Sequence, residues 1–181
     1  MSASADWLMV IDLQPAFSHP DSPWFTPTLP GVAGRIAQLV SAYAGRVAFT
    51  RFVPLVKPSG AWRHYYERWP FALEPEAAWL WDLDVPWMDR PSLASHTFSK
   101  WLPPMRDRCG AGGAAVLCGV STDCCVLMTA LGAVDDGVPV RVVADACAAK
   151  TPDAHGRALD IMASRAPMLG IVTTEQELSS R

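Results

Sequence analysis

Two adjacent cysteines in the middle of the chain are the residues best suited to covalent chemistry. Cys124 and Cys125 follow a short apolar run and a small-polar turn, and apolar residues recur at helical spacing after them. This pattern predicts a strand, a tight turn and a helix whose first turn holds both thiols. Unpaired backbone N–H groups and the positive end of the helix dipole stabilise a thiolate there, which favours a nucleophile. The alternative is that both cysteines are small core residues.

Three charged residues are candidates to act with a thiol. Asp12, Arg51 and Lys100 each come directly after an apolar run that predicts a strand. The carboxyl ends of parallel strands form the ligand-binding edge of an α/β sheet, so these residues are expected to converge there with Cys125. Asp12 could take the proton of the thiol and Lys100 could hold an anion, which together predict acyl transfer. The alternatives are that Asp12 only caps a turn and that Arg51 is exposed and without a role.

The elements that would position these residues alternate regularly along the chain. Short apolar runs predict about six strands, at 7–11, 47–50, 93–99, 114–118, 138–144 and 168–172. Segments of helical periodicity lie between several of them, which predicts an α/β fold: a three-layer α/β/α sandwich around a central parallel sheet. Because 181 residues, half of them hydrophobic, can bury one sizeable core, residues 1–181 are expected to form a single domain.

Residues 62–87 interrupt this alternation with an irregular segment rich in proline and large aromatic rings. So many rings favour a lid, a pocket wall or a subunit interface. The alternative is a satellite hydrophobic cluster that packs a long loop onto the body. His64 has no second ligand at metal-binding spacing, so no metal site is expected here.

Composition excludes several classes of protein. The net charge is −3 and the 15 basic residues are scattered, which predicts neither nucleic-acid nor membrane binding. The first residues lack the basic and apolar regions of a signal peptide, so a soluble, cytoplasmic protein is expected. Five cysteines without C-x-x-C spacing favour reduced thiols over a disulfide framework or a zinc ribbon.

Two motifs resemble those of the isochorismatase-like cysteine hydrolases. They are Val10–Phe17, which reads V-I-D-L-Q-P-A-F, and Gly119–Val126, which reads G-V-S-T-D-C-C-V and is followed by T-A-L-G-A. The superfamily includes nicotinamidases and amidohydrolases that act on carbamoyl and ureido compounds. The resemblance covers nearly the whole chain and implies hydrolysis of a small-molecule C–N bond through a thioester, without a cofactor, in a homodimer or homotetramer.

The same resemblance assigns roles to individual residues. The cysteine before the valine of the second motif is the nucleophile, which is Cys125 and leaves Cys124 as its variable neighbour. The family pattern also implies Asp12 as the base, a cis peptide bond before Ser121, and an oxyanion hole formed by the N–H groups of Ser121 and Cys125. The candidate substrate-binding residues are Gln14, Phe17, Arg51 and Trp101.

The sequence also departs from the family pattern. No lysine stands at the usual distance before the nucleophile, so Lys100 is assigned that role across a shortened loop, with Arg90 as the fallback. The D-x-H metal ligands of nicotinamidases are missing after the second strand, which disfavours that activity and predicts a metal-independent enzyme. The displaced lysine favours the alternative of a catalytically weak binding or regulatory protein. A redox role for the adjacent thiols ranks last, because neighbouring cysteines pair poorly.

Overall fold

Six parallel strands form the central sheet. The computed structural model describes residues 6–109 and 112–181, and its strand order is β3-β2-β1-β4-β5-β6. The strands are β1 (Trp7–Ile11), β2 (Val47–Phe52), β3 (Ser92–Ser95), β4 (Ala115–Val120), β5 (Val140–Ala148) and β6 (Leu169–Val172). The chain moves outward from β1 to β3 and then returns to place β4 beside β1. Such a reversal opens a crevice at the carboxyl ends of β1 and β4, where α/β sheets bind ligands.

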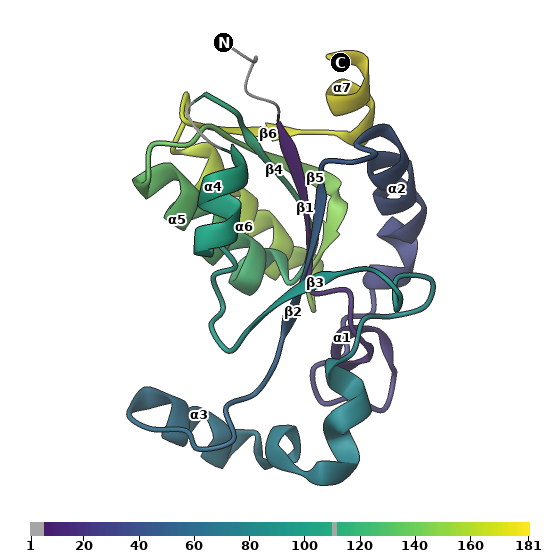
Figure 1. Ribbon diagram of the computed structural model, residues 1–181, viewed down its shortest axis with the longest axis vertical. Helices are drawn as coiled ribbons and strands as arrows, with labels where there is room; N and C mark the ends of the chain where they lie inside the picture. The colour runs from purple at the N-terminus through teal and green to yellow at the C-terminus, as the bar shows by residue number, and fades with distance from the viewer. Residues whose placement is uncertain (1–5, 110–111) are drawn as a thin grey trace.

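Helices cover both faces of the sheet, and this confirms the predicted three-layer sandwich (Figure 1). One face carries α4 (Pro103–Cys109), α5 (Leu127–Asp135) and α6 (Pro152–Ala163). The other face carries α2 (Leu29–Ala42) and α7 (Thr174–Ser179), and the short α1 (Pro15–Ser18) follows β1.

The side chains of β1 show why its sequence is apolar without interruption. Leu8 and Val10 belong to the core on the α2 side, whereas Met9 and Ile11 belong to the core on the α5 and α6 side. All four are fully buried, because successive side chains of a strand point to opposite faces and both faces are covered. Burying each such side chain contributes about 1.5–3 kcal/mol, which fixes the strand that ends at Asp12.

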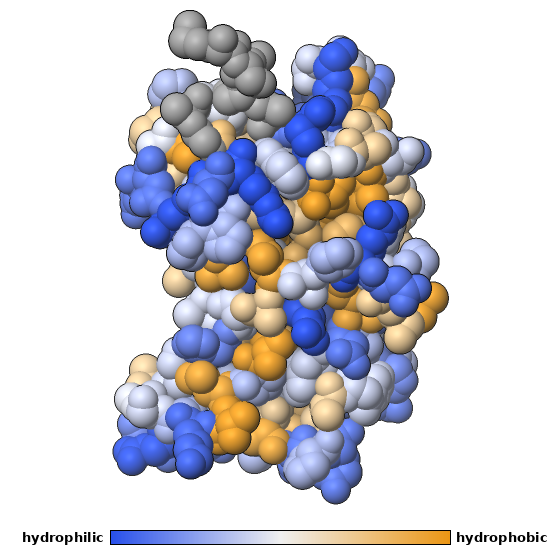
Figure 2. All heavy atoms as spheres, viewed as in Figure 1, coloured by the Kyte–Doolittle hydropathy of each residue, from blue (hydrophilic) through white to orange (hydrophobic). Residues whose placement is uncertain are grey.

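The aromatic segment folds into one helix and two short 3₁₀ helices beyond the carboxyl ends of the strands (Figure 1). They are α3 (Ala61–Arg68), η1 (Pro70–Leu73) and η2 (Pro75–Trp81). The sequence prediction of an irregular segment is wrong for these residues. The aromatic rings follow no helical period in the sequence, and tertiary contacts hold the helices in place. Trp24 is the centre of these contacts, with ring centroids 5.2–6.2 Å from those of Tyr65, Trp69, Phe71 and Trp81. Figure 2 shows hydrophobic residues at the surface between this aromatic segment and the rest of the molecule.

Several strand boundaries differ from the sequence prediction, and the carboxyl ends of β3 and β5 differ most. β3 ends at Ser95 instead of residue 99, because the Ser95 hydroxyl accepts a hydrogen bond from the Thr97 N–H at 3.1 Å and turns the chain. β5 continues to Ala148 and contains Asp145, whose carboxylate accepts hydrogen bonds from the Thr174 backbone and hydroxyl at 2.7 and 2.9 Å. Lys100 therefore lies on a loop and not at a strand end.

Across residues 6–109 and 112–181, every helix is too short or too polar to span a bilayer.

Candidate active site

Asp12 is held at the carboxyl end of β1 in a conformation that is uncommon for its residue type. Its φ is 52°, in the left-handed region, and its side chain is fully buried. The Thr50 hydroxyl donates to Asp12 Oδ1 at 2.7 Å, and the Asp12 N–H donates to the Thr50 carbonyl at 3.2 Å. A left-handed conformation of a non-glycine residue costs about 1–3 kcal/mol, so it persists only where the surrounding structure enforces it. Such conformations are often found at functional sites.

Lys100 is the cation that lies beside Asp12. Its Nζ is 3.2 Å from Asp12 Oδ2, and both side chains are fully buried. The ammonium also donates to the Thr97 carbonyl at 2.5 Å, and the Lys100 backbone N–H donates to the Thr129 hydroxyl at 2.8 Å. The loop after β3 thus brings Lys100 to the sheet edge. The fallback residue Arg90 lies elsewhere, beside α2 and β2, where it lines a 680 Å³ groove.

Gly119 allows β4 to approach β1 closely enough to place the nucleophile turn next to Asp12. Its φ is 118°, and a Cβ at this position would lie 2.2 Å from the Ile11 carbonyl oxygen. Only glycine accepts both conditions. The peptide bond between Val120 and Ser121 is cis, and the chain then enters η3 (Thr122–Val126).

The two cysteines lie in this η3 turn, which is π-helical, and not in the first turn of α5 as the sequence predicts. The Ser121 carbonyl accepts from the Cys124 and Val126 N–H groups, each at 3.1 Å, which widens the turn before α5 begins at Leu127. The Thr129 hydroxyl then donates to the Cys125 carbonyl at 2.6 Å. Because Thr129 also binds the Lys100 backbone, one side chain ties the nucleophile turn to the lysine loop.

Burial dominates the electrostatics of the acid. It raises the pKa of Asp12 above its ordinary value, although the Lys100 ammonium, the Thr50 hydroxyl and the Cys125 thiol each act in the opposite direction. A carboxylate with a raised pKa is a stronger base than an exposed one. Asp12 is therefore suited to accept a proton from a neighbouring thiol.

Each of the two adjacent thiols affects the titration of the other. The Cys124 side chain raises the pKa of Cys125 well above its ordinary value, and burial and the Asp12 carboxylate add to the effect, while Lys100 opposes it. The Cys125 side chain lowers the pKa of Cys124 against the effect of burial. The position near a helix N-terminus favours a thiolate, whereas these neighbours favour the protonated form of Cys125. Asp12 would have to remove the proton during the reaction.

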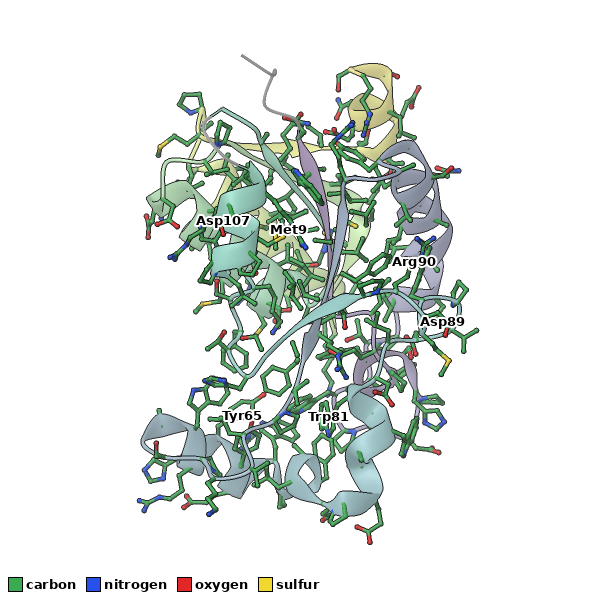
Figure 3. The ribbon with its side chains drawn as sticks, in the orientation of Figure 1. Met9, Tyr65, Trp81, Asp89, Arg90 and Asp107 are labelled. Carbon is green, nitrogen blue, oxygen red and sulfur yellow. The ribbon has the colours of Figure 1, made fainter. Side chains whose placement is uncertain are left out.

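A cavity of about 190 Å³ opens at this edge of the sheet. Both thiols and Ser121 form part of its wall, and six aromatic side chains form most of the rest: Phe17, Trp24, Phe52, Tyr65, Trp69 and Phe98. The segment that holds α3 therefore provides a wall of the cavity as well as a packed aromatic cluster. Figure 3 shows Tyr65 and Trp81 in this region, between the strand ends and the aromatic segment.

Comparisons with known proteins give the family. The model of the isochorismatase domain matches residues 6–177. The chain belongs to the isochorismatase family. A search of curated proteins finds no match.

Solved structures share the fold of this isochorismatase domain at low sequence identity. A cysteine hydrolase from Pseudomonas syringae pv. phaseolicola has a TM-score of 0.82 at 18% identity, with 99% of this chain and 93% of that chain covered. An isochorismatase-like hydrolase from Alkaliphilus metalliredigens has a TM-score of 0.77 at 18% identity, covering 97% and 98%. A pyrazinamidase of Pyrococcus horikoshii in complex with zinc has a TM-score of 0.67 at 21% identity, covering 93% and 98%.

The residues of this isochorismatase domain do not fit a metal of that kind. Among residues 6–109 and 112–181, no group of three or more His, Cys, Asp and Glu side chains could hold a metal ion. His64 is exposed and lies 3.0 Å from Glu67, one turn along the same helix. β2 ends with Phe52 and the chain continues with Val53, and neither residue offers a side-chain ligand. The chemistry proposed for this site therefore involves no metal ion.

Two candidate substrate-binding residues of the domain have structural roles instead. The Gln14 amide donates to the Phe52 and Trp81 carbonyls at 2.9 and 2.8 Å, and its oxygen accepts from the Phe52 N–H at 2.7 Å. Trp101 is buried, and its indole N–H donates to Asp136 at 2.6 Å. Both side chains are engaged with the protein and lie outside the cavity lining.

Arg51 is also directed away from the cavity. It lies within β2, which continues to Phe52, and its guanidinium contacts the Asp82 carboxylate and the Trp81 carbonyl, each at 3.3 Å. The sequence places Arg51 at the correct edge, but the direction of a side chain depends on its position in the pleat. Of the four predicted substrate contacts, Phe17 is the one that lines the cavity.

Sequence reasoning missed several features of the site. Trp24, from the proline-rich connection before α2, and Lys150, from the loop after β5, both line the cavity. The Thr122 hydroxyl lies 2.9 Å from His155 Nδ1, so α6 supports the nucleophile turn. The large ring of Trp24 is a signal that could have been used, whereas Lys150 and His155 carry no local pattern that marks them.

Proposed function

We propose that this isochorismatase domain is a cysteine hydrolase that cleaves the C–N bond of a small amide, carbamoyl or ureido compound. The observation that supports this most directly is the convergence of Asp12, Lys100 and Cys125 at the crevice between β1 and β4. The cavity wall contains Cys125, so a bound carbonyl can reach the thiol. Family members are hydrolases, and the chemistry below is consistent with that class.

In the first half-reaction, the Asp12 carboxylate accepts the proton of Cys125 as the sulfur attacks the carbonyl carbon. A C–S bond forms, and the carbonyl electrons move to oxygen. The backbone N–H groups of Ser121 and Cys125 are the proposed donors to this oxyanion. The intermediate collapses, the C–N bond breaks, and the proton held by Asp12 passes to the leaving nitrogen. Ammonia or an amine departs and a thioester remains.

In the second half-reaction, Asp12 accepts a proton from a water molecule while the oxygen of that water attacks the thioester carbonyl. The C–S bond then breaks, the carboxylic or carbamic acid is released, and the proton returns from Asp12 to the Cys125 sulfur. Lys100 stays beside Asp12 throughout and favours the anionic form of the carboxylate between the proton transfers. The sum is the addition of one water molecule across the C–N bond.

The decisive experiment compares the two thiols. Small amides, carbamoyl compounds and ureido compounds are assayed for ammonia release with the wild type, Cys125→Ala and Cys124→Ala. We expect Cys125→Ala to lose activity by about 10⁴-fold or more, because the proposed thioester forms on the Cys125 sulfur. Cys124→Ala should lose far less. Circular dichroism should show both variants folded.

Three outcomes would change this proposal. Undiminished turnover by Cys125→Ala would remove the nucleophile, and a total loss confined to Cys124→Ala would reassign it. Binding of panel compounds by a wild type that releases no product would favour the alternative, a catalytically weak binding or regulatory protein.

A further inference from the structure

The cavity contains one hydroxyl that the protein leaves unpaired. Besides the thiols, its hydroxyl and ammonium groups come from Thr26, Tyr65, Ser121 and Lys150. The Ser121 hydroxyl donates to a neighbouring carboxylate, and the Thr26 hydroxyl and the Lys150 ammonium donate to backbone carbonyls. Within the described part of the chain, the Tyr65 hydroxyl alone among these groups makes no hydrogen bond. It is therefore available to a ligand.

The ring of Tyr65 is held firmly by its neighbours. Its centroid lies 5.4 Å from those of Trp62 and Phe98 and 5.9 Å from that of Trp24. Aromatic rings packed at these distances and angles restrict one another, so the hydroxyl keeps a defined direction. Tyr65 thus presents its polar end to the cavity from a rigid support, in the region between α3 and the body of the molecule that Figure 3 shows.

Tyr66, the next residue of α3, provides a direct contrast. Its side chain is buried, its hydroxyl accepts a hydrogen bond from the Leu55 N–H at 3.4 Å, and it does not line the cavity. Two tyrosines of one helix therefore have different environments: Tyr66 is engaged by the protein, and Tyr65 is not.

Tyr65 and the two thiols line the same cavity. Burial raises the pKa of Tyr65 above its ordinary value, and the nearby Cys124 and Cys125 side chains raise it further. The phenol therefore keeps its proton at neutral pH and can donate a hydrogen bond close to the nucleophile.

We propose that Tyr65 is a substrate-binding residue that donates a hydrogen bond to an acceptor atom beside the scissile carbonyl, and that it selects small planar amides carrying such an acceptor. This inference rests on the proposed hydrolase function. The six aromatic walls favour a flat apolar body, and 190 Å³ is below the range of about 300–1,000 Å³ typical of drug-sized ligands. A substrate without the acceptor would cover the half-buried Tyr65 hydroxyl without pairing it, which lowers the transition-state binding of that substrate.

The test uses benzamide and the three pyridinecarboxamides, which have nearly the same shape and differ by one ring nitrogen. We expect the wild type to favour at least one pyridine isomer over benzamide. Tyr65→Phe should lower kcat/KM for that isomer by about tenfold, the effect of one hydrogen bond near 1.4 kcal/mol, and should leave benzamide within about twofold. Tyr66→Phe is the matched control and should preserve the wild-type preference.

The outcomes separate this inference from the proposed function. An unchanged preference in Tyr65→Phe, or an equal loss on all four amides, would overturn the role of Tyr65. So would a wild type that ignores these four compounds but hydrolyses other amides, and in that case the hydrolase proposal would stand. Failure of the wild type on every amide and ureido compound tested would overturn both.

Discussion

Charged side chains are buried at both ends of the sheet, but the two buried carboxylates accept different numbers of hydrogen bonds. At the amino ends, the buried Glu177 accepts hydrogen bonds from Arg141 at 2.7 and 2.9 Å and a further bond from the Tyr43 hydroxyl. At the carboxyl ends, Lys100 lies 3.2 Å from Asp12 Oδ2, but this oxygen has no donor at hydrogen-bonding geometry among the described residues. One buried carboxylate is saturated and the other is not.

We infer from this difference that the pair at the amino ends is structural and that the Asp12–Lys100 pair is reactive. A buried carboxylate that accepts several hydrogen bonds from the protein has few lone pairs left for another partner. The Asp12 carboxylate keeps one oxygen free and has a raised pKa, so it remains basic although it is buried. Buried ion pairs contribute little net stability because desolvation offsets their attraction. We therefore expect changes at the carboxyl ends to affect activity and changes at the amino ends to affect stability.

The largest effect is expected from replacing the reactive pair as a unit. Asp12→Asn combined with Lys100→Met should lower kcat by about 10²–10⁴-fold, because the base is lost. The free energy of unfolding should stay constant or rise, by up to about 1–4 kcal/mol, since no buried charge remains unpaired. Ammonia release and urea unfolding measure the two quantities. Asp82→Asn, at an exposed ion pair on the same side of the sheet, is the control and should change neither strongly.

The pH dependence of stability provides a second readout of the same pair. The pKa of Asp12 is raised in the folded state above the ordinary 3.8, so the folded protein binds this proton more tightly than the unfolded chain does. The free energy of unfolding should therefore fall as pH rises from 3.8 through the raised value. The double variant should lack this component. A large loss of stability at neutral pH in the double variant would contradict the assignment of the pair as reactive and not structural.

The opposite result is expected at the amino ends. Glu177→Gln removes the charge that Arg141 and Tyr43 contact and should lower the free energy of unfolding by about 2–3 kcal/mol. Activity per folded molecule should stay within about twofold, because the site lies at the other end of the sheet. Glu175→Gln, exposed on the same helix, should change stability by no more than about 0.5 kcal/mol. A selective loss of activity in folded Glu177→Gln would break the comparison.

The sequence predicts well what short-range pattern controls. The apolar run before Asp12 and the turn before Cys125 are local signals, and the sheet, its layers and the positions of two proposed catalytic residues follow from such signals. Lys100 could be assigned because it is the only lysine between Lys57 and Cys125. Its contact with Asp12 depends on a loop, which no periodicity describes.

The missing parts depend on tertiary contacts. Arg51 stands at the correct edge, but the pleat of β2 directs it to Asp82. Gln14 belongs to a family motif, but its amide is engaged by backbone groups that are distant in the sequence. The aromatic segment folds around Trp24, which lies far from it in the chain. In each case the side chain's partner is long-range, so composition can indicate a role without giving its direction.

The smallest expected effect concerns the neighbour of the nucleophile and sharpens the account of the reactive edge. The Cys124 side chain contributes to the raised pKa of Cys125, so Cys124→Ala should lower that pKa. The rate of Cys125 alkylation by iodoacetamide, resolved by peptide mapping, should then begin to rise at a lower pH than in the wild type. A shift of up to about one pH unit corresponds to one net hydrogen bond.

Cys124→Ser separates the effect of a polar neighbour beside Cys125 from a change in packing. Because its hydroxyl keeps a hydrogen-bonding group beside Cys125, its alkylation profile should lie between those of the wild type and Cys124→Ala. Identical profiles for all three proteins would show that the Asp12 carboxylate and burial alone set the resting state of the nucleophile. An upward shift in Cys124→Ala would mean that Cys124 favours the Cys125 thiolate, and the reactive edge would then be activated before substrate binds instead of during the attack.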